Sequence, residues 1–178
     1  RLRCVTGVQT CALPICVETI ALATATGYAK ALELPGDNYG FIPSIGMVVG
    51  YICGATLIPK YLSQATAMKI CAIIAIIGSA LVATMPAEIS IYCIFFMALG
   101  CSLMWPALWP LAMADLGKFT KAGSSLLTMA IAGGAVMPWV RGVVQDATSF
   151  QTSYWICVPC FLFILYYGMI GYKIRTKK

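Results

Sequence analysis

Long apolar runs separated by short polar turns set the pattern of this chain. The runs cover residues 16–32 and about residues 41–59, 67–84, 89–116, 124–143 and 154–172. Roughly 20 apolar residues carry a helix across a bilayer, and the intervening turns contain the Pro, Gly and charged residues that end helices. The pattern therefore predicts five complete membrane helices and, over 16–32, part of a sixth. The expected fold class is all-α, a polytopic membrane helix bundle.

Composition supports lipid as the solvent. Of the 178 residues, 61% are hydrophobic and 10% are charged, whereas soluble domains carry roughly 25% charged residues. Mean hydropathy is +0.88. Histidine is absent, which removes the commonest metal ligand and the usual general base at neutral pH. We therefore expect neither an enzyme nor a resident cofactor or metal.

The charged residues separate by side when the predicted turns are placed alternately on the two faces of a membrane. One face collects Lys60, Lys69, Lys118, Lys121, Lys173, Arg175, Lys177 and Lys178 against Asp115. The other collects Lys30 and Arg141 against Glu33, Asp37, Glu88 and Asp146. The positive-inside rule predicts a multi-pass protein with its C-terminus in the cytoplasm, and we expect the membrane to be of the bacterial inner type. The C-terminal basic cluster is typical of such a flank rather than of a nucleic-acid surface, and Arg141, near its helix end, is expected to snorkel to the interface.

The first fifteen residues differ in character from the rest of the chain. The stretch Val5–Ile15 (VTGVQTCALPI) resembles the translation of a common short-read sequencing adapter. A short signal-like segment is the rival interpretation, but no long apolar core or small-residue cleavage site follows the basic start. We predict that residues 1–15 are an artefact and that the native domain occupies residues 16–178.

Small residues predict close contacts between helices. Gly46, Gly50 and Gly54 recur every four residues and form a ridge that suits close helix packing. Six cysteines lie inside apolar runs, where cysteine behaves as a small hydrophobe: Cys53, Cys71, Cys93, Cys101, Cys157 and Cys160. The Cys157–Cys160 pair has redox-motif spacing without the strand-then-helix context that such a motif needs.

Candidate chemistry begins in the first run. Glu18 has only apolar or small neighbours on its own helical face, and Thr19 lies on the adjacent face. A carboxylate inside a membrane helix is a functional-site candidate. The alternative is that Glu18 lies in the headgroup region near the true helix end.

The fourth run contains an unusual pair of prolines. Pro106 and Pro110 follow Trp105 and Trp109, and the i, i+4 spacing of the tryptophans places both on one helix face. A proline inside a helix removes a hydrogen bond and clashes with the preceding turn, so we expect a bend here. Gly133–Gly134, in the middle of the fifth run, predicts tight packing or a hinge.

The segment Ser102–Gly142 resembles the tenth and eleventh helices of the fucose permease/glucose–galactose transporter family of the major facilitator superfamily. The family's proline-containing helix leads into a turn matched here by Leu116, Gly117, Thr120, Lys121, Gly123 and Ser124, and Gly133–Gly134 matches its glycine-rich next helix. Val17–Glu18–Thr19 is similar to the family's seventh-helix motif. Arg141 and Gln145 depart from the apolar or small residues expected there.

The resemblance implies a C-terminal six-helix half of a twelve-helix carrier, with its first helix truncated. It implies uptake of a hexose of the fucose, glucose or galactose type by alternating access, coupled to protons. The N-terminal six-helix half, which in this family holds most of the coupling carboxylates, is the expected partner, together with the lipid bilayer.

In that reading Trp105 and Trp109 offer flat faces to a sugar ring, Glu18 and Thr19 hydrogen-bond its hydroxyls, and Pro106, Pro110, Gly133 and Gly134 serve bending or gating. Lipid contact or packing is the alternative for the tryptophans. A carrier for another small solute and a non-transporting membrane protein are the alternative functions.

Overall fold

The computed structural model describes residues 2–33, 38–58, 60–113 and 117–171, and all regular structure within them is helical. The predicted all-α fold is therefore confirmed. Residues 34–37, Asp115, Leu116 and the basic cluster at 173–178 lie outside the described residues. The helices are α1 Leu2–Ala31, α2 Phe41–Leu57, α3 Gln64–Thr84, α4 Ala87–Ser102, α5 Met104–Met113, α6 Thr120–Ala130, α7 Gly133–Ala147 and α8 Cys157–Met169, with short 3-10 turns η1 Asn38–Gly40, η2 Gly117–Phe119 and η3 Thr152–Ile156.

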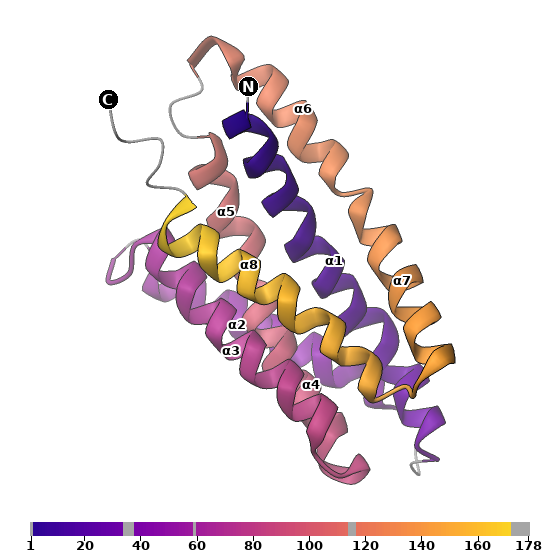
Figure 1. Cartoon of the computed structure of the whole chain (residues 1–178). Coiled ribbons are helices and arrows are strands. Elements are labelled where there is room, and N and C mark those ends of the chain that lie inside the picture. Colours follow the sequence, from indigo (N-terminus) through magenta and orange to yellow (C-terminus); the bar gives the residue numbers. More distant parts are fainter. Residues whose placement is uncertain (1, 34–37, 59, 114–116, 172–178) are drawn as a thin grey trace.

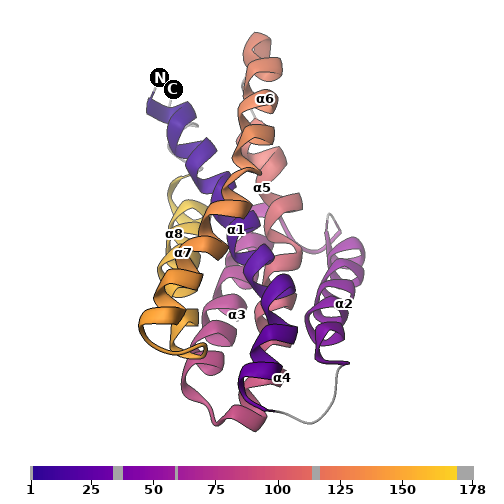
Figure 2. The same ribbon diagram turned by 90° about the vertical axis from the view of Figure 1, so that its right-hand side faces the viewer.

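These helices form six spans, because α4 with α5 and α6 with α7 each make one broken span (Figures 1 and 2). Five are long and apolar enough to cross a membrane: Ala12–Ala31, Gln64–Thr84, Glu88–Met113, Thr120–Ala147 and Thr152–Met169. The sixth, α2, is a shorter apolar helix of 17 residues. The start of α1 and the end of α8 lie at one end of the bundle, and the α3–α4 and α7–α8 connections lie at the other (Figure 1).

Helix α1 crosses the bundle and contacts α2, α4, α5, α6, α7 and α8. One side of it, made by Val17, Ile20, Ala21, Ala25 and Tyr28, is fully buried. The helix extends through residues 2–15 and includes Pro14. The assignment of residues 1–15 as an artefact stays a prediction.

The glycine ridge of α2 packs against α4, as predicted. A Cβ atom added at Gly46 would lie 2.6 Å from the carbonyl oxygen of Phe95. At Gly50 an added Cβ would overlap the side chain of Ser102, and at Gly54 that of Leu103. The absence of a side chain at each of these positions therefore allows the two helix backbones to approach closely.

The fourth span breaks at Leu103, three residues before Pro106. Pro106 has no N–H to donate to the carbonyl of Ser102, so the helical ladder cannot continue through that residue. The N–H of Ala107 restores it by donating to the carbonyl of Leu103 at 3.0 Å. The predicted single run over 89–116 is thus two helices, α4 and α5.

The fifth span breaks just before Gly133. The N–H groups of Ile131, Ala132 and Gly134 each donate to the carbonyl three residues earlier, at 3.1, 3.1 and 2.9 Å. Such tighter 3-10 bonding within a span marks a hinge or local strain. Beyond it, α7 continues to Ala147, past the predicted end at residue 143.

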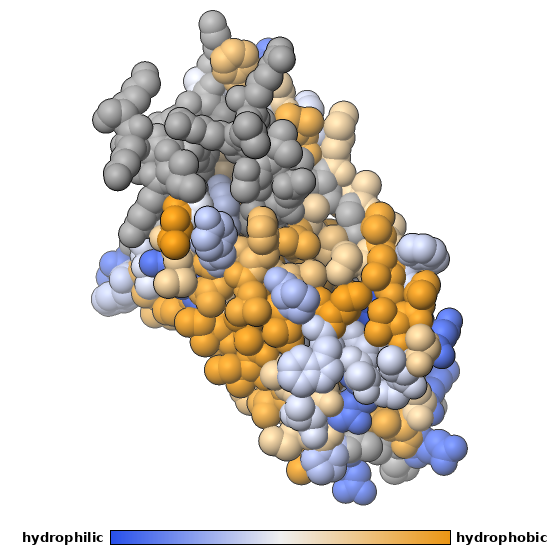
Figure 3. All heavy atoms as spheres, in the orientation of Figure 1, coloured by the Kyte–Doolittle hydropathy of each residue, from blue (hydrophilic) through white to orange (hydrophobic). Residues whose placement is uncertain are grey.

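Apolar side chains cover the outer faces. Figure 3 shows them across the middle of the face formed by α3 and α8, with hydrophilic residues at the lower right and at the left edge. Exposed members include Ile70, Ile73, Ile77, Leu162, Phe163 and Tyr166. This distribution is that of a protein whose middle is solvated by lipid. The six cysteines predicted to act as small hydrophobes are all free thiols, and the prediction is confirmed at the five that are buried but not at the exposed Cys53.

Replacing Gly46 by Ala is expected to destabilise the bundle by about 1–3 kcal/mol, because the new methyl group meets backbone that cannot rotate away. The matched control is Gly142→Ala, since nothing lies within 4 Å of a Cβ at Gly142. The measurement is the melting temperature of the complete protein in detergent, followed by size-exclusion chromatography after heating. Equal melting temperatures for the two variants would contradict the packing described here.

Candidate functional site

Glu18 and Thr19 lie beside the exposed face of α1. Leu22, Ala23 and Thr26 form that face, while Glu18 and Thr19, both half-buried, lie one turn before it. The hydroxyl of Thr19 donates to the carbonyl of Ile15 at 2.7 Å. Both predicted residues are therefore next to a surface that the rest of the described bundle leaves uncovered.

The carboxyl group of Glu18 lies near α2 and α4. It is close enough to Tyr51 of α2 and Cys101 of α4 for each to interact with it electrostatically. Within the described ranges Glu18 has no hydrogen bond and no ion pair. A half-buried carboxyl group without a partner retains its full capacity to bind a polar ligand.

Trp105 and Trp109 pair on one face of α5. Their ring centroids are 5.5 Å apart and the rings meet at 64°, which confirms that the two share a face. Both are half-buried against the core, whereas Pro106 and Pro110 are exposed. The tryptophan pair thus occupies the edge of α5 between its buried and exposed sides.

Gly134 of α7 packs directly on α1. A Cβ atom there would lie 2.9 Å from Cγ2 of Ile15 and 3.2 Å from the hydroxyl oxygen of Thr19. Gly133 opens α7. The structure therefore joins Thr19 to Gly134. It places the tryptophans on α5, a neighbour of α1, but gives no direct contact between them and Glu18 among the described residues.

The expectation that Arg141 snorkels to the interface is wrong. Its side chain is only 3% exposed. Nη2 donates to the carbonyl of Phe150 at 3.4 Å, and Cζ lies 4.4 Å and 4.5 Å from the ring centroids of Phe150 and Tyr154. The prediction failed because α7 continues to Ala147, which puts Arg141 well inside the helix instead of at its end.

A buried polar and aromatic cluster surrounds Arg141. The hydroxyl groups of Tyr154 and Thr24 are 2.7 Å apart, and that of Tyr28 hydrogen-bonds with Ser90 of α4. The ring of Tyr28 lies 5.4 Å from those of both Phe150 and Tyr154. Sequence reasoning missed this cluster. The available signal was an arginine in a small-residue helix followed by Phe150 and Tyr154 just across the next turn.

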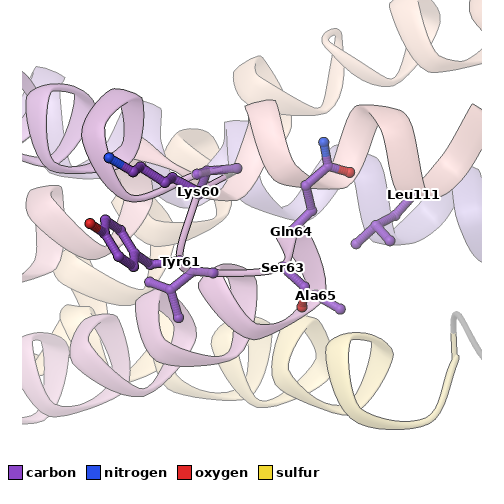
Figure 4. Close-up of a pocket in the computed structure, with 8 residues that line it drawn as sticks. Lys60, Tyr61, Ser63, Gln64, Ala65 and Leu111 are labelled. Atoms are coloured by element: carbon purple, nitrogen blue, oxygen red, sulfur yellow. The ribbon is translucent and has the colours of Figure 1, made fainter.

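A separate hollow of about 560 Å³ lies at the α2–α3 connection. Figure 4 shows Lys60, Tyr61, Ser63 and Gln64 around it, with Leu111 contributed by α5. None of the predicted site residues lines this hollow. The described part of the chain also holds no group of three His, Cys, Asp or Glu side chains that could bind a metal.

The chain is similar in sequence to proteins that are named as sugar transporters. It is 30% identical over 128 residues to a glucose/galactose transporter of Brucella abortus, which covers 72% of this chain and 31% of that protein. It is 32% identical over 136 residues to a putative glucose/galactose transporter of Helicobacter pylori, covering 69% and 33%. To an L-fucose-proton symporter of Escherichia coli it is 28% identical over 151 residues, covering 82% and 34%. No family model matches.

The fold agrees with these relatives. The crystal structure of FucP, a major facilitator superfamily transporter in the outward conformation, superposes with a TM-score of 0.87 at 22% identity, covering 99% of this chain and 43% of FucP. The chain spans about a third of the length of the curated relatives it matches. Those relatives are transporters and not enzymes. This chain is therefore a multi-pass membrane protein, and it belongs to the fucose permease/glucose–galactose transporter family of the major facilitator superfamily.

Proposed function

We propose that residues 16–178 are the C-terminal six-helix half of a carrier that takes up a neutral hexose of the fucose, glucose or galactose type by alternating access. The observation that carries the proposal is the match to glucose/galactose transporters over most of this chain. Carriers of this class bind solute near the bilayer midplane, between their two halves. The N-terminal half of the same polypeptide would complete the site.

The polar groups on and beside the exposed face of α1 support a neutral, hydroxyl-rich solute. A sugar stripped of water needs hydrogen-bond partners for its hydroxyl groups. Glu18 has no partner in the described bundle and would accept such bonds. Thr19 already donates to Ile15, so its oxygen would act as an acceptor.

The tryptophan pair supports a ring-shaped solute. Its T-shaped arrangement leaves two aromatic faces in different directions, and an aromatic face is a suitable surface for the C–H groups of a sugar ring. Pro106 and Pro110 would allow this wall to bend during alternating access, and Gly133 and Gly134 would serve the same purpose in the neighbouring span.

Arg141 does not favour a carrier of anions. Its guanidinium is covered by two rings and a backbone carbonyl, so it is not available to an anionic solute in this conformation. Coupling to protons is part of the proposal, by analogy with the relative from E. coli that is named an L-fucose-proton symporter. The protein would reside in the bacterial inner membrane with its C-terminus in the cytoplasm.

The test is uptake by the complete protein in proteoliposomes. Labelled glucose, galactose or fucose should accumulate under an inward proton gradient, and a protonophore should abolish accumulation. A sodium gradient alone should not drive it. Absence of uptake for all three sugars, in vesicles that contain folded protein, would overturn the proposal.

Replacing Glu18 by Ala is expected to raise the KM for sugar by about tenfold or more, because the hydrogen bonds from the sugar hydroxyl groups to the carboxylate are lost. A loss of roughly 1.4 kcal/mol of binding free energy corresponds to a factor of ten. Glu18→Gln should lose less, since an amide still bonds hydroxyl groups. Glu88, exposed in the first turn of α4, provides the matched control: Glu88→Gln should leave uptake unchanged. Unaltered KM and maximal rate in Glu18→Ala would refute a role for this carboxyl group.

Replacing Trp105 or Trp109 by Ala is expected to raise the KM by a similar factor of about ten, and Phe at either position should retain most of the affinity. Trp139 of α7, with 70% of its side chain exposed, is the control, and Trp139→Ala should have little effect. The measurement is the concentration dependence of initial uptake rates. If all three Ala variants behave alike, the tryptophans of α5 have no specific contact with the sugar.

A further inference from the structure

Arg141 carries a buried charge for which the described residues supply no carboxylate. Its Nε atom is buried and has no hydrogen-bond partner among the described residues. Of its donors, Nη2 reaches the carbonyl of Phe150. Burying an unpaired charge is costly, so the two aromatic rings that flank the guanidinium must offset much of that cost.

The rings do so only while they hold their present positions. A cation over an aromatic face is held more strongly when it is desolvated, and here the ring centroids of both Phe150 and Tyr154 lie within 4.5 Å of Cζ. Phe150 belongs to the α7–α8 connection and Tyr154 to η3. Arg141 therefore links the C-terminal half of α7 to the segment that begins the last span.

The same two rings contact α1. Tyr154 shares a hydrogen bond with Thr24 at 2.7 Å, and Phe150 lies against Gly27, where an added Cβ would be 3.4 Å from Cζ of the ring. Tyr28 of α1 packs on both rings and bonds with Ser90 of α4. A continuous set of contacts thus runs from α7 through η3 to α1 and α4.

We propose that Arg141 is a positioning residue. By holding Phe150 and Tyr154 it fixes α1 against α7 and η3. In this way it sets where Glu18 and Thr19 of α1 lie relative to the rest of the bundle. Thr24 is less than two helical turns beyond Thr19. A displacement of α1 at Thr24 is therefore transmitted along the helix to Glu18 and Thr19. The consequence for sugar affinity rests on the proposed function, whereas the contact itself does not.

The first experiment measures the contact alone. Cys157, the first residue of α8, is fully buried and lies in the neighbourhood of Arg141, whereas Cys71, also buried, lies on α3. Arg141→Met keeps the length of the side chain and removes the charge and the donors. In the complete protein in membranes, labelling by N-ethylmaleimide, resolved by mass spectrometry, should become about tenfold faster at Cys157, the factor that corresponds to a loss of roughly 1.4 kcal/mol of local stability.

Cys71 should label at the wild-type rate in the same sample, and Arg141→Lys should give an intermediate rate at Cys157. Lysine keeps the charge but cannot stack on a ring and donate to the Phe150 carbonyl together. An unchanged rate at Cys157 overturns the proposal. Equal acceleration at Cys157 and Cys71 also overturns it, because that result means general loosening of the bundle.

The second experiment measures the effect on α1. Tyr154→Phe keeps the ring beneath Arg141 and removes the hydroxyl group that bonds Thr24. It should raise the KM for sugar severalfold with little change in maximal rate or in Cys157 labelling. An unchanged KM overturns the link from Arg141 to α1. If the wild-type protein transports no sugar, the proposed function fails, and the labelling experiment still decides the role of Arg141.

Discussion

Close approach of helix backbones at glycine is the contact on which this bundle depends. Lipid tails are as apolar as leucine, so no hydrophobic force draws membrane helices together, and packing must do so. Gly78 of α3 and Gly100 of α4 lie where a Cβ would come within 2.6 Å of Met97 nitrogen and Cys71 oxygen, respectively. Gly46 does the same between α2 and α4. Helix α4 is therefore held from two sides by glycine contacts, and α5, which carries the tryptophan pair, begins where α4 ends.

Helix breaks occur in two of the spans next to α1. Non-helical backbone at membrane depth persists only where the freed polar groups find partners or face protein. At Leu103 the N–H bonds to the carbonyl of Cys101, and before Gly133 the tighter 3-10 bonds take over. At each break several backbone N–H groups thus stay bonded where the regular helix is interrupted.

The sequence was sufficient for features that depend on local spacing. Hydropathy located the spans, the i, i+4 interval put Trp105 and Trp109 on one face, and the four-residue interval of Gly46, Gly50 and Gly54 predicted the α2 ridge. The sequence was insufficient where the burial or bonding of a residue depends on partners that are distant along the chain. Arg141 is buried because Phe150 and Tyr154 fold back over it, and their position along the chain suggests this contact but does not fix it. The ends of helices were also not predicted correctly. The side chain of Ser63 caps α3 by accepting a hydrogen bond from the N–H of Thr66 at 3.2 Å, so this helix begins inside a stretch predicted to be loop.

Glu18 and Arg141 are two charged residues inside membrane spans with different surroundings. Arg141 is enclosed by two aromatic rings and a carbonyl group, so its charge interacts with neighbouring helices and not with a ligand. Glu18 has no such enclosure in the described bundle and lies beside the exposed face of α1. A carboxyl group left without partners next to an uncovered surface is costly unless something else satisfies it. Because the neighbouring faces of α1 and α5 offer hydroxyl and aromatic groups rather than cations, the solute that we propose for this surface is neutral and polar.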